Sequence, residues 1–151
     1  MIQIVNYQPS HASAFKELNA AWINKYFEME ESDRKMLDDP QGYILDKGGA
    51  ILIALMDEKP IGTCALIKME EEVYELAKMA VSPEAQGQKI GWKIGLATIE
   101  KAKELGANRV YLETNSVLKP AISLYRKLGF KDTEGYCSPY ARCNVQMELI
   151  L

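Results

Sequence analysis

The segment best suited by its residue types to bind an anion is a turn rich in glycine and glutamine, residues 86–91. It reads QGQKIG and lies between a predicted strand and a predicted helix. The first turn of a helix presents unpaired backbone N–H groups and a partial positive charge, which together attract phosphate. The Walker A pattern and the dinucleotide fingerprint G-x-G-x-x-G are both absent. Close packing of the helix on the sheet is the structural alternative, because Gly87, Gly91 and Gly95 are spaced four apart along one helix face.

Nucleophilic and metal-binding side chains are scarce. The only histidine is His11, and the three cysteines, Cys64, Cys137 and Cys143, form no C-x-x-C pair. A histidine-based metal site, a Ser–His–Asp triad and a disulfide framework are therefore not expected. We predict no bound metal, and reduced thiols of the kind found in cytosolic proteins.

The charges are distributed unevenly along the chain. The formal net charge is -3, but residues 28–75 contain 13 acidic and 5 basic side chains, whereas residues 76–131 contain 10 basic and 4 acidic ones. A pI near 5.3 argues against nucleic acid as a partner. The division indicates a basic segment for an anionic ligand and an acidic one for a cation, with ordinary variation of surface charge as the alternative.

Length and composition predict one domain over residues 1–151. Hydrophobic residues make up 48% of the chain and charged residues 26%, which excludes wholesale disorder and allows a buried core. The longest uncharged apolar run, residues 48–56, is too short to span a bilayer. Polar residues interrupt the first positions, so no signal peptide is recognised, and cytoplasmic localisation without a membrane partner is expected.

The periodicity of apolar residues and the turn signals predict the elements that position these segments. Strands are expected at residues 2–7, 50–56, 61–69, 73–81, 109–113, from 130 and at 144–149. Helices are expected after Pro9-Ser10, over 32–37, from the glycine-rich turn to about 103 and over 119–128. This order predicts an α+β fold, with a mixed, mostly antiparallel sheet, helices on both faces and a parallel strand pair flanking the glycine-rich helix.

Three motifs, in order and correctly spaced, resemble the GNAT superfamily of N-acetyltransferases. VSPEAQGQKIG at 81–91 is similar to the family's acetyl-CoA loop, V-x-P-x-x-[RQ]-G-x-G-x-[GA]. ETN at 113–115 follows at the end of the next strand, and LYRKLGF at 124–130 looks like the family's L-Y-x-K-x-G-F segment. The predicted element order matches the GNAT fold over nearly the whole chain. The resemblance implies an acetyl-CoA-dependent enzyme that acetylates a primary amine.

The resemblance also implies how the cofactor, acetyl-CoA, is held. Backbone N–H groups of the loop bind its phosphates, and pantetheine pairs with the exposed edge of the splayed strand before the loop. A backbone N–H of Met79 or Ala80 then faces the thioester oxygen. The expected cofactor-binding residues are Met79, Ala80, Val81, Gln86, Gly87, Gln88, Lys89, Ile90, Gly91, Trp92, Asn115 and Tyr125.

One loop position departs from the family pattern, because Lys89 replaces the middle glycine. We expect this position to donate only its backbone N–H and to have a helical φ, which a lysine adopts without strain. A positive φ would instead cost about 1 kcal/mol or more.

The resemblance assigns catalytic roles to two residues. Tyr125 is the expected general acid that protonates the departing thiolate, with packing on the sheet as the alternative. Glu75 is the expected base, with a solvent-facing carboxylate and a water chain as the alternative. Glu75 precedes Val81 by six residues, so strand alternation predicts that both lie on one face. Asn115 is expected to bind the cofactor or an ordered water, or else to cap a turn.

The acceptor site is the part that the motifs define least. The aromatic residues expected to line one wall, next to the acidic stretch 28–39, are Trp22, Tyr26 and Phe27. Candidates for the other wall are Tyr136, Tyr140 and Arg142. Both sets have ordinary core packing as their alternative, and an amino acid, a polyamine, an aminoglycoside and a protein amine all remain open as acceptors.

The cysteines lack a histidine partner, so direct attack of the amine in a ternary complex is expected in place of an acyl-enzyme. A non-catalytic acyl-CoA-binding or sensor module is the alternative function. Homodimerisation through a sheet edge is left open.

Overall fold

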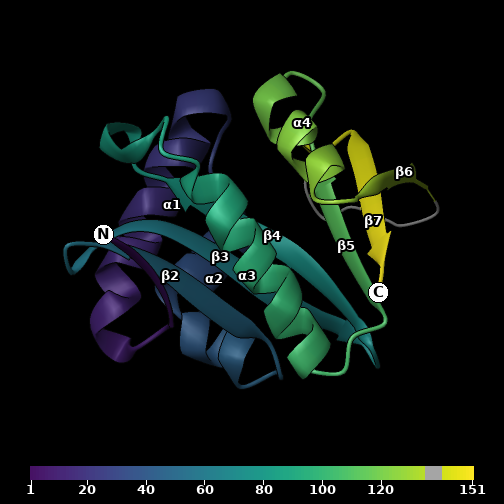
Figure 1. Cartoon of the computed structure of the whole chain (residues 1–151), viewed down its shortest axis with the longest axis horizontal. Coiled ribbons are helices and arrows are strands. Elements are labelled where there is room, and N and C mark those ends of the chain that lie inside the picture. Colours follow the sequence, from purple (N-terminus) through teal and green to yellow (C-terminus); the bar gives the residue numbers. More distant parts are fainter. Residues whose placement is uncertain (135–140) are drawn as a thin grey trace.

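The computed structural model describes residues 1–134 and 141–151 and contains a seven-stranded sheet in the order β1-β2-β3-β4-β5-β7-β6 (Figure 1). The strands are β1 (Ile2–Asn6), β2 (Ala50–Met56), β3 (Lys59–Glu70), β4 (Val73–Val81), β5 (Arg109–Thr114), β6 (Lys131–Thr133) and β7 (Val145–Ile150). The helices are α1 (Ala12–Tyr26), α2 (Glu31–Asp38), α3 (Ile90–Glu104) and α4 (Lys119–Lys127), with single helical turns at Pro9–His11, Gln41–Leu45 and Pro83–Ala85. The predicted strands and helices are confirmed, and only the single turns were not foreseen.

The sheet separates two hydrophobic cores, which explains why β2 is apolar along almost its whole length. Leu52 and Ala54 pack with residues of α3, whereas Ile51 and Ile53 pack with residues of α1 and α2. A strand buried on both faces shows a continuous apolar run in place of alternation. Helices therefore cover both faces of the sheet (Figure 1), and the predicted α+β fold is confirmed. Within the described residues, no helix is both long and apolar enough to cross a bilayer.

The parallel strand pair, β4 and β5, is joined only where the two strands begin. Residues 73–75 of β4 are in register with residues 109–111 of β5, and all other neighbouring strands are antiparallel. The register ends there, although β4 continues to Val81 and β5 to Thr114. Figure 1 shows the two strands diverging beyond their paired ends. The splayed parallel pair that the resemblance implies is confirmed.

A β-bulge interrupts β4 beside this opening. Thr63 of β3 pairs with Ala80 and Ala65 pairs with Ala77, so two residues of β4 lie opposite one residue of β3. Lys78, within the bulge, has a φ of 53°, and the Thr63 hydroxyl donates a hydrogen bond to the Lys78 carbonyl at 2.8 Å. An extra residue of this kind reverses the alternation of side chains beyond it.

The bulge contradicts the expectation that Glu75 and Val81 share one face of β4. Val81 packs against the core cluster that contains Leu76, whereas Glu75 alternates with Leu76 and points to the other face. Strand alternation applies only to a regular strand, so the prediction was wrong because the inserted residue shifts the count by one.

Two glycines of α3 allow this helix to approach α4 closely. A Cβ atom on Gly91 would lie 3.1 Å from Leu124 Cδ2, and one on Gly95 would lie 2.8 Å from Leu128 Cδ1. Gly87 has no such neighbour within 4 Å, but its φ of +88° is one that glycine adopts freely. The packing alternative therefore accounts for Gly91 and Gly95, with a second helix as the contact surface, and backbone conformation accounts for Gly87.

Candidate active site

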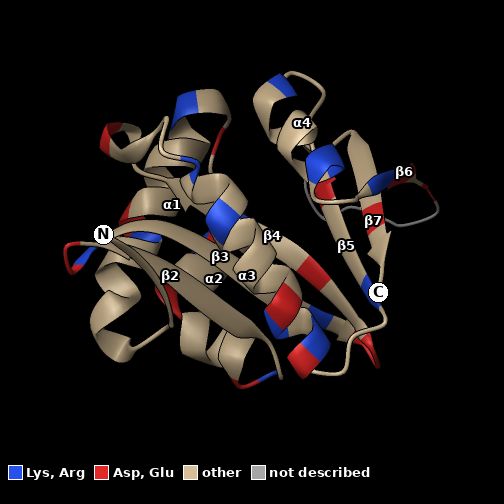
Figure 2. Ribbon diagram, viewed as in Figure 1, with Lys and Arg blue, Asp and Glu red and all other residues tan. Residues whose placement is uncertain are grey.

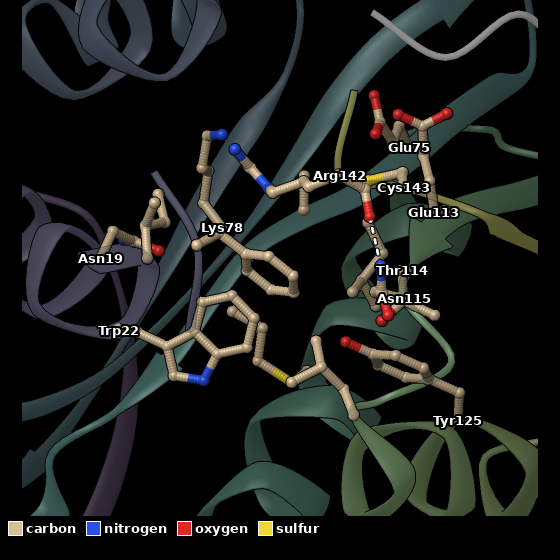
Figure 3. A pocket seen from close by; sticks show the side chains of 16 residues that line it. Asn19, Trp22, Glu75, Lys78, Glu113, Thr114, Asn115, Tyr125, Arg142 and Cys143 are labelled. Atoms are coloured by element: carbon tan, nitrogen blue, oxygen red, sulfur yellow. Dashed lines mark hydrogen bonds between the residues drawn. The ribbon is translucent and has the colours of Figure 1, made fainter. Parts of the chain in front are cut away.

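A cavity of about 80 Å³ lies beside the opening between β4 and β5 (Figure 3). Residues from α1, β4, β5, α4 and the segment before β7 line it. They are Asn19, Trp22, Ile23, Phe27, Glu75, Leu76, Ala77, Lys78, Met79, Glu113, Thr114, Asn115, Leu118, Tyr125, Arg142 and Cys143. The two catalytic candidates, three of the cofactor candidates (Tyr125 is in both groups) and three of the candidates for the acceptor walls are thus brought to one cavity.

Tyr125 lies on α4, and its hydroxyl is directed toward the cavity (Figure 3). Its ring packs edge-on against Phe130, with 6.2 Å between the ring centroids. Burial raises the pKa of the Tyr125 phenol well above its usual value, with smaller contributions in the same direction from Cys64 and Cys143. The phenol therefore stays protonated at neutral pH and is able to donate a proton.

Glu75 lies on β4, on the same side of the cavity as Glu113 of β5 (Figure 3). The pKa of Glu75 is raised to about 7, first by burial and then by the charge of Glu113, while the charge of Lys78 lowers it. Glu113 accepts a hydrogen bond from the Tyr111 hydroxyl at 2.7 Å, and Tyr111 is the register partner of Glu75. A carboxyl group with a pKa near 7 exchanges a proton readily at physiological pH.

Asn115 connects the end of β5 to the segment that precedes β7. Its side-chain amide donates to the Arg142 carbonyl at 2.6 Å (Figure 3), and its carbonyl oxygen accepts from the Val117 backbone N–H at 2.9 Å. These bonds are those of a turn-capping residue, as the alternative interpretation expected.

A largely buried ion network includes two side chains that line the cavity, Lys78 and Arg142. The Asp33 carboxylate of α2, which is 0% exposed, accepts from Lys78 Nζ at 2.6 Å and from the two terminal nitrogens of Arg142 at 2.6 and 2.9 Å. Glu30 lies 3.3 Å from the same guanidinium. Burial alone would raise the pKa of Asp33, but the hydrogen bonds from Arg142 and the charge of Lys78 lower it to about 2. Asp33 is therefore ionised at neutral pH.

The glycine-rich loop lies outside this cavity, at the N-terminus of α3. Residues 86–89 are exposed, whereas the Ile90 side chain is 2% exposed and belongs to the core, so Ile90 offers a ligand only its backbone. Lys89 has φ 59° and ψ 31°, which is the left-handed conformation. The expectation of a helical φ at Lys89 was wrong, and its backbone is in the conformation that the family's glycine adopts without strain.

The remaining candidates divide between the cavity and its surroundings. Trp22 and Phe27 line the cavity, whereas Tyr26 is 47% exposed and does not, although its ring centroid lies 5.4 Å from that of Trp22. Ala80 and Val81 are also outside the lining. Of the proposed second wall, Arg142 lines the cavity, and Tyr136 and Tyr140 lie outside the described residues.

Comparison with known proteins places the chain in a family. The family model described as "Acetyltransferase (GNAT) family" matches residues 14–130. The chain belongs to the GNAT family. A GNAT relative, the uncharacterised N-acetyltransferase YjgM of Escherichia coli, is 39% identical over 88 residues, which are 57% of this chain and 53% of the relative. The chain spans about half the length of the first curated relatives that it matches.

Solved GNAT structures share the fold over nearly the whole chain. An acetyltransferase of the GNAT family from Staphylococcus aureus Mu50 superposes with a TM-score of 0.88 at 22% identity, covering 98% of each chain. The phosphinothricin acetyltransferase of Sinorhizobium meliloti, solved in complex with acetyl-CoA, superposes with a TM-score of 0.82 at 18% identity, covering 99% of this chain and 88% of that one. The predicted GNAT fold is confirmed.

Several lining residues of this GNAT chain were not predicted from the sequence. The alternation of side chains along β5 places Glu113 on the same face as Tyr111. Only the pairing of β5 with β4 shows that this face adjoins Glu75. Lys78 was not predicted either. The pairing of Lys78 and of the predicted Arg142 with Asp33 was also missed, because these residues lie 45 and 109 positions from Asp33 and no local pattern predicts such pairs. Among residues 1–134 and 141–151, no three His, Cys, Asp or Glu side chains are grouped to hold a metal ion.

Proposed function

We propose that the chain transfers the acetyl group of acetyl-CoA to a primary amine, which attacks the thioester directly in a ternary complex. The observation that carries this proposal is the opening between β4 and β5, because it brings Glu75, Met79 and Tyr125 to a single cavity. Family membership supports the reaction type, and the acetyl-CoA complex of the S. meliloti neighbour supports the cofactor.

The cofactor phosphates are bound by the backbone N–H groups of residues 87–92 at the start of α3, with Gln86 alongside. The left-handed backbone of Lys89, directly before the helical backbone of Ile90, supports this role, because consecutive residues of opposite handedness form a concave surface of N–H donors. Lysine and arginine are present on both α3 and α4 (Figure 2), which suits a polyanionic ligand. Pantetheine extends along residues 79–81, the edge of β4 that is not in register with β5.

Met79 is the better candidate for the oxyanion donor, because it lines the cavity and Ala80 does not. The carbonyl of Lys78 and the N–H of Met79 belong to one trans peptide and point in opposite directions. Because the Thr63 hydroxyl of β3 donates a hydrogen bond to that carbonyl, the Met79 N–H is directed away from β3, toward the opening between β4 and β5. An N–H fixed in this way stabilises the negative charge that develops on the thioester oxygen.

The reaction then needs three proton transfers. Glu75, directly or through water, takes a proton from the acceptor ammonium, and the neutral amine attacks the thioester carbon, which leaves a positive charge on the nitrogen. The carbon–sulfur bond of the tetrahedral intermediate breaks, Tyr125 protonates the coenzyme A thiolate, and the second proton that the nitrogen loses as the amide forms restores the Tyr125 phenol through water. The raised pKa of Glu75 supports its role as the base, and the raised pKa of Tyr125 keeps its phenol protonated until the thiolate departs.

The base role of Glu75 predicts a pH dependence. With a pKa of about 7, the basic carboxylate is populated above pH 7 and lost below it. We therefore expect kcat/KM for the amine to fall as the pH decreases below 7, and Glu75→Gln to lower kcat/KM and abolish this pH dependence. Rates measured from pH 5.5 to 9 check this. Glu100→Gln, on the exposed side of α3, is the control that keeps the wild-type profile, and a Glu75→Gln profile identical to wild type would contradict the role.

Lys89→Gly tests the loop. Relief of the left-handed lysine is expected to raise the free energy of unfolding by up to about 1 kcal/mol. The acetyl-CoA KM should change by less than about tenfold, because the backbone N–H is retained. Lys93→Gly, in the exposed interior of α3, is the matched control and should lower stability by about 1 kcal/mol. Loss of acetyl-CoA binding in a titration of Lys89→Gly would show that the ammonium is required.

A non-catalytic acyl-CoA-binding module is the second candidate. The raised pKa values and the cavity favour catalysis over this alternative. Calorimetric titration with acetyl-CoA, combined with a thiol assay for coenzyme A release in the presence of a panel of amines, separates the two. Binding with amine-dependent release supports the transferase, and binding without release supports the sensor.

A further inference from the structure

The two cationic side chains that line the cavity, Lys78 and Arg142, are already paired with a carboxylate of the protein. Asp33 contacts Lys78 at 2.6 Å and Arg142 at 2.6 Å, and the Arg142 contact is bidentate. Asp33 is fully buried, and the Lys78 side chain is 4% exposed. A carboxylate on the acceptor would have to displace Asp33 from both cations and leave a buried charge behind, which is strongly unfavourable.

Carboxylates outnumber cations around the cavity in the part of the chain that the structure describes. Glu75 and Glu113 line it together with Lys78 and Arg142. Asp33 contacts both of these cations, and Glu30 contacts Arg142. Four carboxyl groups thus accompany two cations. An acceptor carboxylate would be repelled, whereas an acceptor with more than one positive charge would be attracted.

The two glutamates occupy neighbouring strands, and both line the cavity. Glu75 is on β4, and Glu113 is on β5, where the Tyr111 hydroxyl orients its carboxylate at 2.7 Å. Only one of them is needed to deprotonate the attacking amine. Trp22 and Phe27 also line the cavity, and aromatic rings attract ammonium groups.

From these contacts we infer that the acceptor is a diamine: an amine that carries a second positive charge, held at Glu113, and no carboxylate. This inference rests on the proposed acetyl transfer and names the class of its acceptor. Glu113 is a substrate-binding residue in this account, and the Asp33 network excludes amino acids by occupying Lys78 and Arg142.

Three probes that share a five-carbon chain test the inference. Lysine is cadaverine with an added carboxylate, and pentylamine is cadaverine without its second amine. We expect kcat/KM for cadaverine to exceed the values for lysine and for pentylamine by at least about tenfold each, since unfavourable or missing charge pairs of this kind strongly change affinity. Equal kcat/KM values for lysine and cadaverine would overturn the inference that the site excludes carboxylates. Equal kcat/KM values for pentylamine and cadaverine would overturn the inference that the site binds a second positive charge.

A variant tests the residue that we assign. Glu113→Gln should reduce the cadaverine-to-pentylamine ratio of kcat/KM to less than about threefold. Glu148→Gln is the matched control, because Glu148 of β7 is the register partner of Tyr111 on the same face but does not line the cavity, and it should keep the wild-type ratio. An unchanged ratio in Glu113→Gln would overturn the assignment.

A binding measurement separates failure of this inference from failure of the proposed function. If wild type acetylates no amine, the proposed function fails, and calorimetry with the coenzyme-A-loaded protein still tests the site. Tighter binding of cadaverine than of lysine and pentylamine would support the inference, and equal or reversed affinities would overturn it.

Discussion

Tyr125→Phe is expected to lower kcat by at least about tenfold while the acetyl-CoA KM stays within about threefold of wild type, as for loss of a general acid. Burial keeps the Tyr125 phenol protonated. In the variant, which lacks this hydroxyl, the thiolate must depart unprotonated or take its proton from water. The phenylalanine ring preserves the edge-on contact with Phe130, so the packing of α4 should be maintained.

Steady-state kinetics at saturating amine measure this effect, and thermal unfolding checks that the variant folds. Tyr74→Phe is the matched control, because Tyr74 is a buried tyrosine of β4 that packs in the same core cluster but does not line the cavity. It should keep kcat near the wild-type value. A Tyr125→Phe enzyme with wild-type kcat would remove the residue from the mechanism.

Asp33→Asn should lower the free energy of unfolding by about 3–5 kcal/mol, the usual effect of removing one partner from a buried ion pair. The substitution leaves Lys78 and Arg142 buried without the carboxylate that contacts both. Urea unfolding followed by circular dichroism measures the loss. Asp38→Asn is the control, because the Asp38 side chain is 58% exposed in its pair with Lys16, and a change of less than about 1 kcal/mol is expected there.

The same network predicts how stability depends on pH. The pKa of Asp33 is lowered from 3.8 to about 2 in the folded chain, so the folded state favours the ionised form. Its stabilisation is fully present above about pH 4 and is lost as the pH falls through about 2. Between these values wild type should lose stability more steeply than Asp33→Asn, and equal pH slopes would contradict the account.

Most of the fold could be predicted from the sequence because its signals are local. The apolar run of β2 and the glycine-rich turn before α3 each depend on neighbouring residues, and each predicted element is present. Asn115 and Tyr125, two site residues that belong to motifs, were found in the same way and do line the cavity.

What the sequence did not reveal depends on pairing between distant segments or on a single inserted residue. The bulge at Lys78 is one residue within an apolar strand, and it reversed the predicted relation between Glu75 and Val81. Lys89 has a positive φ directly before α3. Lysine rarely adopts this conformation, so its residue type led to the wrong prediction of a helical φ. Asp33 reads as one of many acidic surface residues in its segment, and only the tertiary structure brings it to two cations.

The central claim, amine acetylation at the opening between β4 and β5, is tested most directly by mass spectrometry of the reaction products. The purified chain is incubated with acetyl-CoA and a library of amines that includes cadaverine, lysine and pentylamine. The account predicts an acetylated amine formed in equal amount with free coenzyme A, with cadaverine acetylated in preference to lysine. Intact acetyl-CoA and unmodified amines after prolonged incubation, with the cofactor bound, would contradict it.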